Sequence, residues 1–210
     1  MGCMTMGGMT MGWMSMLKHT LVCVMAESSA GKDRLVSKIC ELTGWSQLIS
    51  YTTRPRRENE GNTHIFVSEK EYEEMRDAGQ VAAYTCINGY HYWSTVDQIY
   101  DADLYIIDPI GVKTLKDMNM PNLRIITIYI NVPEDVRRER AKSRGDDMNV
   151  YRSRSQSERD QFRNMKRNCE FDYAVPNEDF ATSLSVLKWI CNAEGLWKNH
   201  VEDEEYEDHM

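Results

Sequence analysis

Short apolar runs alternate with amphipathic segments along this chain, and this alternation restricts the possible folds more than any other feature. The runs His19–Met25, Leu104–Ile107 and Arg124–Ile130 predict buried strands. Between the first two of them, Lys32–Leu42 has its apolar residues at helical spacing, so these residues share one face. Apolar strands that alternate with helices predict an α/β fold in which helices cover both faces of a central parallel sheet.

The remaining segments extend this pattern. Shorter strands are expected at Gln47–Tyr51, Ile65–Val67 and Tyr173–Val175, and helices at 68–79, Gly111–Met118, 131–143, Ser155–Arg167 and Glu178–Asn192. The segment Val81–Ser94 contains the turn signal Asn88-Gly89 and predicts an antiparallel hairpin. An antiparallel piece between the strands of a parallel sheet indicates an inserted α+β subdomain. Gly145–Asn149 is expected to be a loop.

Charge and cysteine content exclude several classes of function. The chain has 210 residues, enough for one domain with an insertion, and a formal net charge of -8. This acidic balance argues against a general nucleic-acid binder. No apolar run approaches the length of a membrane span. The six cysteines contain no C-x-x-C pair and no metal-ligand spacing, so we expect a reducing, cytoplasmic compartment.

The two ends of the chain have compositions that differ from the rest. Residues 1–16 repeat methionine at every second or third position, and we expect either a disordered arm or a start assigned too early, with Met14 or Met16 as the true start. Residues 197–210 contain the acidic run Glu202–Asp208 and are expected to form a solvated tail. The folded domain is therefore expected to span residues 17–196.

The segment LVCVMAESSAGKDRLVSKI, residues 21–39, joins an apolar strand to a helix through small residues. It approaches the phosphate-binding loop G-x-x-x-x-G-K-[ST], with Ala26 at the first glycine and Asp33 at the final hydroxyl. In such a loop, backbone N–H groups at a helix N-terminus bind the phosphates of ATP, and Lys32 would reach the terminal ones. Asp33 is a candidate ligand for Mg²⁺. A plain strand–turn–helix with an exposed lysine is the alternative interpretation.

Five segments add a pattern that covers Thr20 to about Asn192. They are SYTTRPRRENEGNTHIFVS, NGYHYWST, YIIDPIGVKTL, RRERAKSRGDD and DYAVPNED. In this order they resemble the motifs of guanylate kinases, which transfer a phosphoryl group from ATP to a nucleoside monophosphate. The resemblance implies a P-loop kinase fold with a monophosphate-binding insertion at about 52–97 and a short arginine-rich lid at about 144–155.

The resemblance also assigns roles to individual residues. It implies an ATP-phosphate loop formed by Ala26, Glu27, Ser28, Ser29, Ala30, Gly31, Lys32 and Asp33. It implies a monophosphate site formed by Ser50, Arg54, Arg57 (or Arg56), His64, Tyr92, Ser94 and Asp108. It implies that catalysis rests on Lys32, which contacts the ATP phosphates, and on Arg140 and Arg144, which clamp the transferring group with help from Arg152 or Arg154. Arginine suits these roles because its planar fork matches the oxygens of a phosphate.

Several positions depart from the family pattern. His64 stands where guanylate kinases have a phosphate-binding tyrosine, and Trp93 stands where they have glycine. Ile106 and Ile110 replace an aspartate and a glutamine. Ala83 replaces a glutamate that reads guanine, so the phosphate chemistry is better supported than the choice of base.

Three functions remain open at this stage. The first is a nucleoside monophosphate kinase acting on GMP or dGMP, as a monomer or a homodimer, without nucleic-acid or membrane partners. The second is another small-molecule kinase, because a G-K-D loop is also found in ribose 1,5-bisphosphate phosphokinases. The third is a non-catalytic binding module similar to the guanylate-kinase-like domains of scaffold proteins. Those modules lose the loop lysine and the lid arginines, whereas Lys32, Arg140 and Arg144 are present here.

Overall fold

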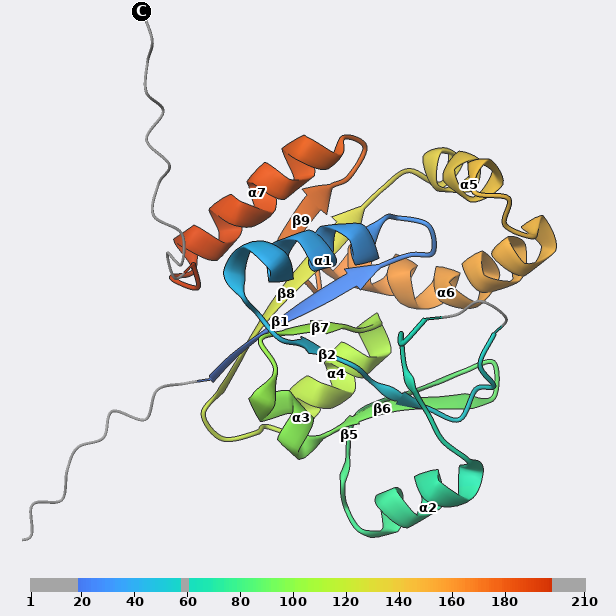
Figure 1. Ribbon diagram of the computed structural model, residues 1–210, viewed down its shortest axis with the longest axis vertical. Coiled ribbons are helices and arrows are strands. Elements are labelled where there is room, and N and C mark those ends of the chain that lie inside the picture. The colour runs from blue at the N-terminus through green and yellow to red at the C-terminus, as the bar shows by residue number, and fades with distance from the viewer. Residues whose placement is uncertain (1–18, 58–60, 198–210) are drawn as a thin grey trace, which may run out of the picture.

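The computed structural model describes residues 19–57 and 61–197 (Figure 1). The Met-rich arm expected at 1–16 and nearly all of the tail expected at 197–210 lie outside these ranges. Within the described residues, no helix is both long and apolar enough to cross a membrane.

Five strands form the main sheet, in the order β2-β7-β1-β8-β9. Their bounds are Gln47–Leu48 for β2, Leu104–Ile106 for β7, His19–Ala26 for β1, Leu123–Asn131 for β8 and Tyr173–Pro176 for β9. All neighbouring strands in this sheet run parallel. The expected α/β fold with a central parallel sheet is therefore confirmed.

Helices cover both faces of this sheet because the side chains of β1 alternate between two apolar clusters. Val22 and Val24 pack with α1 (Lys32–Thr43) and α7 (Phe180–Ala193). Leu21, Cys23 and Met25 pack on the other face, with residues of α3 (Val96–Asp101), α4 (Pro109–Asp117) and α6 (Met148–Asn168). Burial raises the pKa of the Cys23 thiol to about 12, so this thiol stays protonated and packs as a small apolar group.

A second sheet of four strands has the order β4-β3-β6-β5. The strands are β3 (Tyr51–Thr52), β4 (Ile65–Phe66), β5 (Val81–Ile87) and β6 (Tyr90–Thr95), and α2 (Glu69–Asp77) lies between β4 and β5 in the chain. The hairpin predicted at Asn88-Gly89 is confirmed, with φ of 53° and 81° at these two residues. Two consecutive positive φ values are typical of a type I′ turn. In Figure 1 this sheet and α2 lie beside the main sheet.

The structure corrects three expectations about local structure. The segment expected as one strand at Gln47–Tyr51 is divided between β2 and β3. Helix α3 was not expected; it begins with a capping box in which Thr95 and Gln98 bond each other's backbone N–H groups. The loop expected at Gly145–Asn149 is shorter, because Asp147 caps α6 at Met148, after α5 (Glu134–Ser143).

Candidate active site

The loop between β1 and α1 lies at the carboxyl end of β1. Alanine disfavours a positive φ, which glycine tolerates. Ala26 is the last residue of the strand and has no positive φ, so alanine in place of the usual glycine causes no backbone strain there. The left-handed conformations instead fall on Ser29, with φ of 65°, and Gly31, with φ of 80°. Glycine is required at position 31 because a Cβ would lie 2.8 Å from Nδ2 of Asn177.

Lys32 and Asp33 form the first turn of α1. The ammonium Nζ of Lys32 lies 3.1 Å from Oδ2 of Asp33, and their side chains are 28% and 78% exposed. Both groups are thus accessible at a helix N-terminus, where backbone N–H groups and the helix dipole favour an anion. A lysine at this place is able to neutralise phosphate charge.

Arginines of α5 approach the same loop. Arg140 donates to three backbone carbonyls, those of Ala30 at 3.4 Å, Asn177 at 2.7 Å and Glu178 at 3.1 Å. Arg144 donates to the hydroxyl of Ser29 at 2.8 Å. Asn177 also donates to the carbonyl of Ala30, at 2.7 Å. These contacts bring two of the predicted arginines to the loop and hold its backbone from outside.

The other two predicted arginines, Arg152 and Arg154, lie on α6. They fall within α6 because this helix begins at Met148 and not at Ser155 as expected. Arg152 donates to the side chain of Asn149 at 3.4 Å. Within the described residues, neither guanidinium hydrogen-bonds the loop, so their role in clamping the transferring group stays a prediction.

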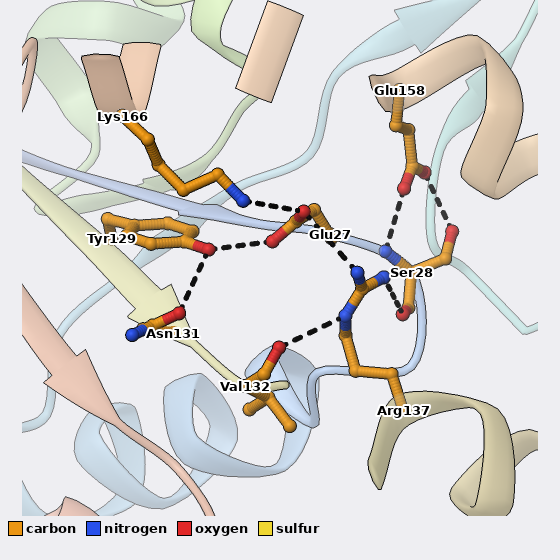
Figure 2. Close-up of polar contacts among 8 residues, drawn as sticks. All are labelled: Glu27, Ser28, Tyr129, Asn131, Val132, Arg137, Glu158 and Lys166. Carbon is orange, nitrogen blue, oxygen red and sulfur yellow. Dashed lines mark hydrogen bonds and ion pairs between the residues drawn. The ribbon is translucent and has the colours of Figure 1, made fainter. Parts of the chain in front are cut away.

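Four further residues contact the loop that the sequence motifs did not identify: Tyr129, Arg137, Glu158 and Lys166 (Figure 2). Their partners are Glu27 and Ser28. Arg137 belongs to a basic cluster that the sequence shows, but its burial, with 5% of its surface exposed, is not apparent from the sequence. Charged residues on a long polar helix, such as Glu158 and Lys166, look like solvated groups in a sequence.

A second polar group gathers on the four-stranded sheet. The hydroxyl of Ser50 lies 2.9 Å from Nδ1 of His64, and the His64 ring meets the Tyr92 ring edge-on at 5.6 Å. Ser94 is fully buried, and its hydroxyl donates to the carbonyl of Ala82 at 3.4 Å. The structure therefore brings together three predicted residues that are distant in sequence, Ser50, His64 and Tyr92.

Asp108 borders this group from the main sheet. It caps α4, and its Oδ1 accepts from the backbone N–H groups of Ile110 at 2.9 Å and Gly111 at 3.1 Å. Burial raises the pKa of Asp108, while these two N–H donors act against the rise. Because Asp108 follows β7 and the phosphate loop follows the adjacent parallel strand β1, both lie at the same edge of the sheet.

Tyr105 of β7 is another residue that the motifs did not identify. Burial raises the pKa of its phenol, and the nearby charge of Asp108 raises it further. The hydroxyls of Ser94 and Ser50 act in the opposite direction as hydrogen-bond partners. Tyr105 thus stands among three of the predicted monophosphate residues.

Basic side chains flank the ring of Phe66 at the end of β4. The guanidinium carbon of Arg54 lies 5.3 Å from the ring centroid, and that of Arg56 lies 4.4 Å from it. Arg54 is buried, with 7% of its surface exposed, while Arg56 and Arg57 are both exposed. The arginine that shares this ring with Arg54 is therefore Arg56, the alternative to Arg57 in the motif.

Trp93 occupies the opposite face of β6 from Tyr92 and Ser94, because side chains alternate along a strand. Its ring stacks on Tyr51 at 5.5 Å and packs against Tyr72 of α2 at 4.8 Å. Trp93 is fully buried. The tryptophan that replaces the family's glycine therefore packs in the core beneath α2, on the face of β6 opposite to the polar group.

Ala83 lies at an irregularity of β5, where the pairing with β6 shifts between Ala82 and Thr85. Its φ is 49° and it is buried. A methyl group has no hydrogen-bonding capacity, so this position supplies no side-chain acceptor to a base.

A five-stranded parallel sheet with a Gly-Lys loop at the end of β1, and a second polar site on an added sheet, defines the class of P-loop kinases. The comparisons agree. The family model described as guanylate kinase matches residues 18–194. The guanylate kinase of Yersinia pestis is 31% identical over 193 residues, which cover 86% of this chain and 91% of that protein. The guanylate kinase of Coxiella burnetii is 28% identical, covering 88% and 92%.

Among solved structures, guanylate kinase from Anaplasma phagocytophilum matches with a TM-score of 0.60 at 22% identity, covering 84% of this chain and 87% of that one. The chain belongs to the guanylate kinase family.

Proposed function

We propose that this protein transfers the terminal phosphoryl group of ATP to GMP or dGMP, giving ADP and the guanosine diphosphate. The observation that carries this proposal is the presence of two groups suited to anions: the loop that ends in Gly31 and Lys32 at the carboxyl edge of the main sheet, and the group around Ser50, His64 and Tyr92 on the four-stranded sheet. Similarity to guanylate kinases over nearly the whole chain supports the same substrates.

The donor side would bind ATP through the loop from Ala26 to Asp33. Backbone N–H groups at the start of α1 would bind the phosphates, and Lys32 would neutralise charge on the terminal ones. Arg144, which donates to the hydroxyl of Ser29, would contact the same phosphates. Phosphoryl transfer requires little acid–base chemistry, so in-line positioning and charge neutralisation account for most of the catalysis.

The acceptor side would hold the monophosphate with Arg54, assisted by Arg56, Ser50, His64 and Tyr92. Charged donors on a phosphate dianion give short, strong hydrogen bonds. Ser94 and Asp108 would contact the base. Since Ala83 supplies no acceptor to guanine, we infer that base selectivity is looser than in relatives that have a glutamate there.

Asp33 fits a role in binding Mg²⁺ together with ATP. Its carboxylate is a hard oxygen donor, exposed in the first turn of α1 beside Lys32. Mg²⁺ is usually held by one or two carboxylates plus substrate phosphates, so a single protein ligand is sufficient. Among the described residues, no group of three acidic, histidine or cysteine side chains forms a separate metal site. The ion would stabilise negative charge on the phosphates.

The cytoplasm is the proposed location, because the reaction needs ATP and the five cysteines in the described ranges are free thiols.

An assay of both products tests the proposal. ADP and GDP should form in equal amounts when ATP, Mg²⁺ and GMP are present together, and ADP formation should fall to background when GMP is omitted. ADP formation that does not depend on any nucleoside monophosphate would mean that water is the acceptor, and would contradict the proposal.

A further inference from the structure

One face of α6 carries an acid, an aromatic ring and a base. Glu158, Phe162 and Lys166 follow one another at intervals of four residues, so they lie in one row along the helix. Phe162 is buried at 2% exposure, with its ring 6.1 Å from that of Tyr129 in β8. The row is therefore anchored to the main sheet at its centre, with a charged group on either side.

The acid of this row bonds the phosphate loop twice. Oε2 of Glu158 accepts from the backbone N–H of Ser28 at 2.8 Å, and Oε1 accepts from the Ser28 hydroxyl at 2.7 Å (Figure 2). Two bonds to one carboxylate fix both the backbone and the side chain of Ser28. Bonds to a charged acceptor are stronger than neutral ones.

The base of the row bonds the preceding residue of the loop. Nζ of Lys166 lies 3.1 Å from Oε1 of Glu27. The same carboxylate accepts from Tyr129 at 2.7 Å and from the buried Arg137 at 3.4 Å (Figure 2). The Glu27 side chain is only 9% exposed, and these three donors satisfy its buried carboxylate oxygens.

The loop has a physical need for such support. Phosphate loops close around their ligand with glycines, but here Gly31 is the single glycine between Ala26 and Asp33. Ser29 is held at φ of 65°, a left-handed conformation that is unfavourable for a residue with a Cβ. A strained residue keeps such a conformation only when its surroundings hold it there. In this chain, contacts from residues outside the loop are available to hold the loop in this conformation.

We propose that Glu158 and Lys166 of α6 are positioning residues for phosphoryl transfer, which act on ATP through Ser28 and Glu27. The two residues tie the first half of the phosphate loop to the helix that also carries Arg152 and Arg154. The geometry of the loop is thereby linked to the arginine-rich segment. This inference rests on the proposed kinase activity.

Steady-state kinetics of Glu158→Ala and Glu158→Gln test the first contact. Loss of charged bonds to Ser28 should lower kcat/KM for ATP by about ten- to a hundredfold. The KM for GMP should stay within about threefold of the wild type, since the acceptor site is on the other sheet. The Gln variant should recover part of the loss, because its amide oxygen still accepts one bond. The control is Asp160→Asn on the same helix, whose exposed carboxylate bonds Arg163 and should leave all constants unchanged.

A double-mutant cycle decides whether Glu158 acts through Ser28. Ser28→Ala removes one of the two donors, so its effect on kcat/KM for ATP and that of Glu158→Ala should be clearly less than additive. Additive effects would overturn the proposal. A lower melting temperature with wild-type kinetic constants below it would also overturn it, because the contact would then serve only folding.

Binding measurements keep this test separate from the proposed function. Titration of the wild type and Glu158→Ala with ADP requires no acceptor and no turnover. Weaker ADP binding in the variant supports the inference even if GMP proves not to be the acceptor. Lys166→Met should show the same direction through Glu27, and ADP binding equal to that of the wild type in both variants would contradict the inference.

Discussion

The phosphate loop and the acceptor group are held in different ways. Side chains from α5, α6 and the segment after β9 bond the loop, through Arg140, Arg144, Glu158 and Asn177. The acceptor group is built mainly from neighbouring strands of one small sheet, as the contact of His64 with Tyr92 shows. Departures from the family pattern are thus accommodated by distant contacts in the loop and by strand alternation in the sheet. Substitutions in the two regions should therefore fail in different ways.

The largest expected effect concerns the core of the small sheet. Trp93→Ala should remove about 3–5 kcal/mol of stability, because a fully buried ring packed on Tyr51 and Tyr72 is lost. The melting temperature should fall by roughly 6–20 °C. The matched control is its neighbour, Tyr92→Phe, which keeps the ring. It should leave the melting temperature nearly unchanged and raise the KM for GMP. The opposite pattern would show that the two faces of β6 are wrongly assigned.

Substitution of Lys32 should have the next largest effect. Lys32→Ala should lower kcat by on the order of 10²–10³-fold or more, since it removes a fixed charge that stabilises the transferring phosphoryl group. Its side chain pairs only with its exposed neighbour Asp33 among the contacts of the described residues, so the melting temperature should barely change. Lys38→Ala, on the same helix and paired with Glu41, is the control and should keep full activity. A kcat of Lys32→Ala close to that of the wild type would contradict the interpretation of this protein as a kinase.

Arg54 separates the acceptor side from the donor side. Arg54→Ala should raise the KM for GMP by about ten- to a hundredfold, because a charged hydrogen bond to the phosphate is lost. The KM for ATP should stay close to that of the wild type. Arg76→Ala on α2, whose exposed guanidinium bonds Asp77, serves as the control. A larger change in KM for ATP than for GMP would place Arg54 on the wrong side of the site.

Asp33 should give the smallest effect, and only on the donor side. Asp33→Ala should raise the Mg²⁺ concentration at half-maximal rate severalfold, because an oxygen ligand is removed. Asp33→Ser should recover much of the activity by supplying the hydroxyl that this loop usually carries. The same Mg²⁺ dependence in both variants and the wild type would mean that Asp33 does not contact the ion.

Sequence patterns predicted the fold well because the signals that define it are local. Strand β1 is an uninterrupted apolar run, and the Asn88-Gly89 turn fixes the hairpin by its backbone preference alone. Apolar periodicity does not predict helix α3, because this helix is short and its start is defined by the capping box at Thr95. The start of α6 was placed too late because Asp147 caps it within a polar segment that resembles a loop.

The sequence motifs indicated the residues of the two proposed anion sites but not the contacts that support them. Ser50, His64 and Tyr92 are recognisable one by one, and the fold brings them together. The bonds of Glu158 to Ser28 join residues 130 positions apart, and nothing in a helix of mixed charges distinguishes this carboxylate from a solvated one. The position of Trp93 also required the structure, since strand alternation shows which face it occupies only once the site is placed.

One measurement tests the central claim most directly: the rate of ADP formation with each ribo- and deoxyribonucleoside monophosphate, and with ribose 1,5-bisphosphate, under identical ATP and Mg²⁺. GMP or dGMP should be the best acceptor. A second nucleotide should follow within about a hundredfold, since the missing acceptor at Ala83 is typically worth about 1.5–3 kcal/mol of discrimination. Activity with ribose 1,5-bisphosphate alone, or with none of these acceptors, would contradict the account.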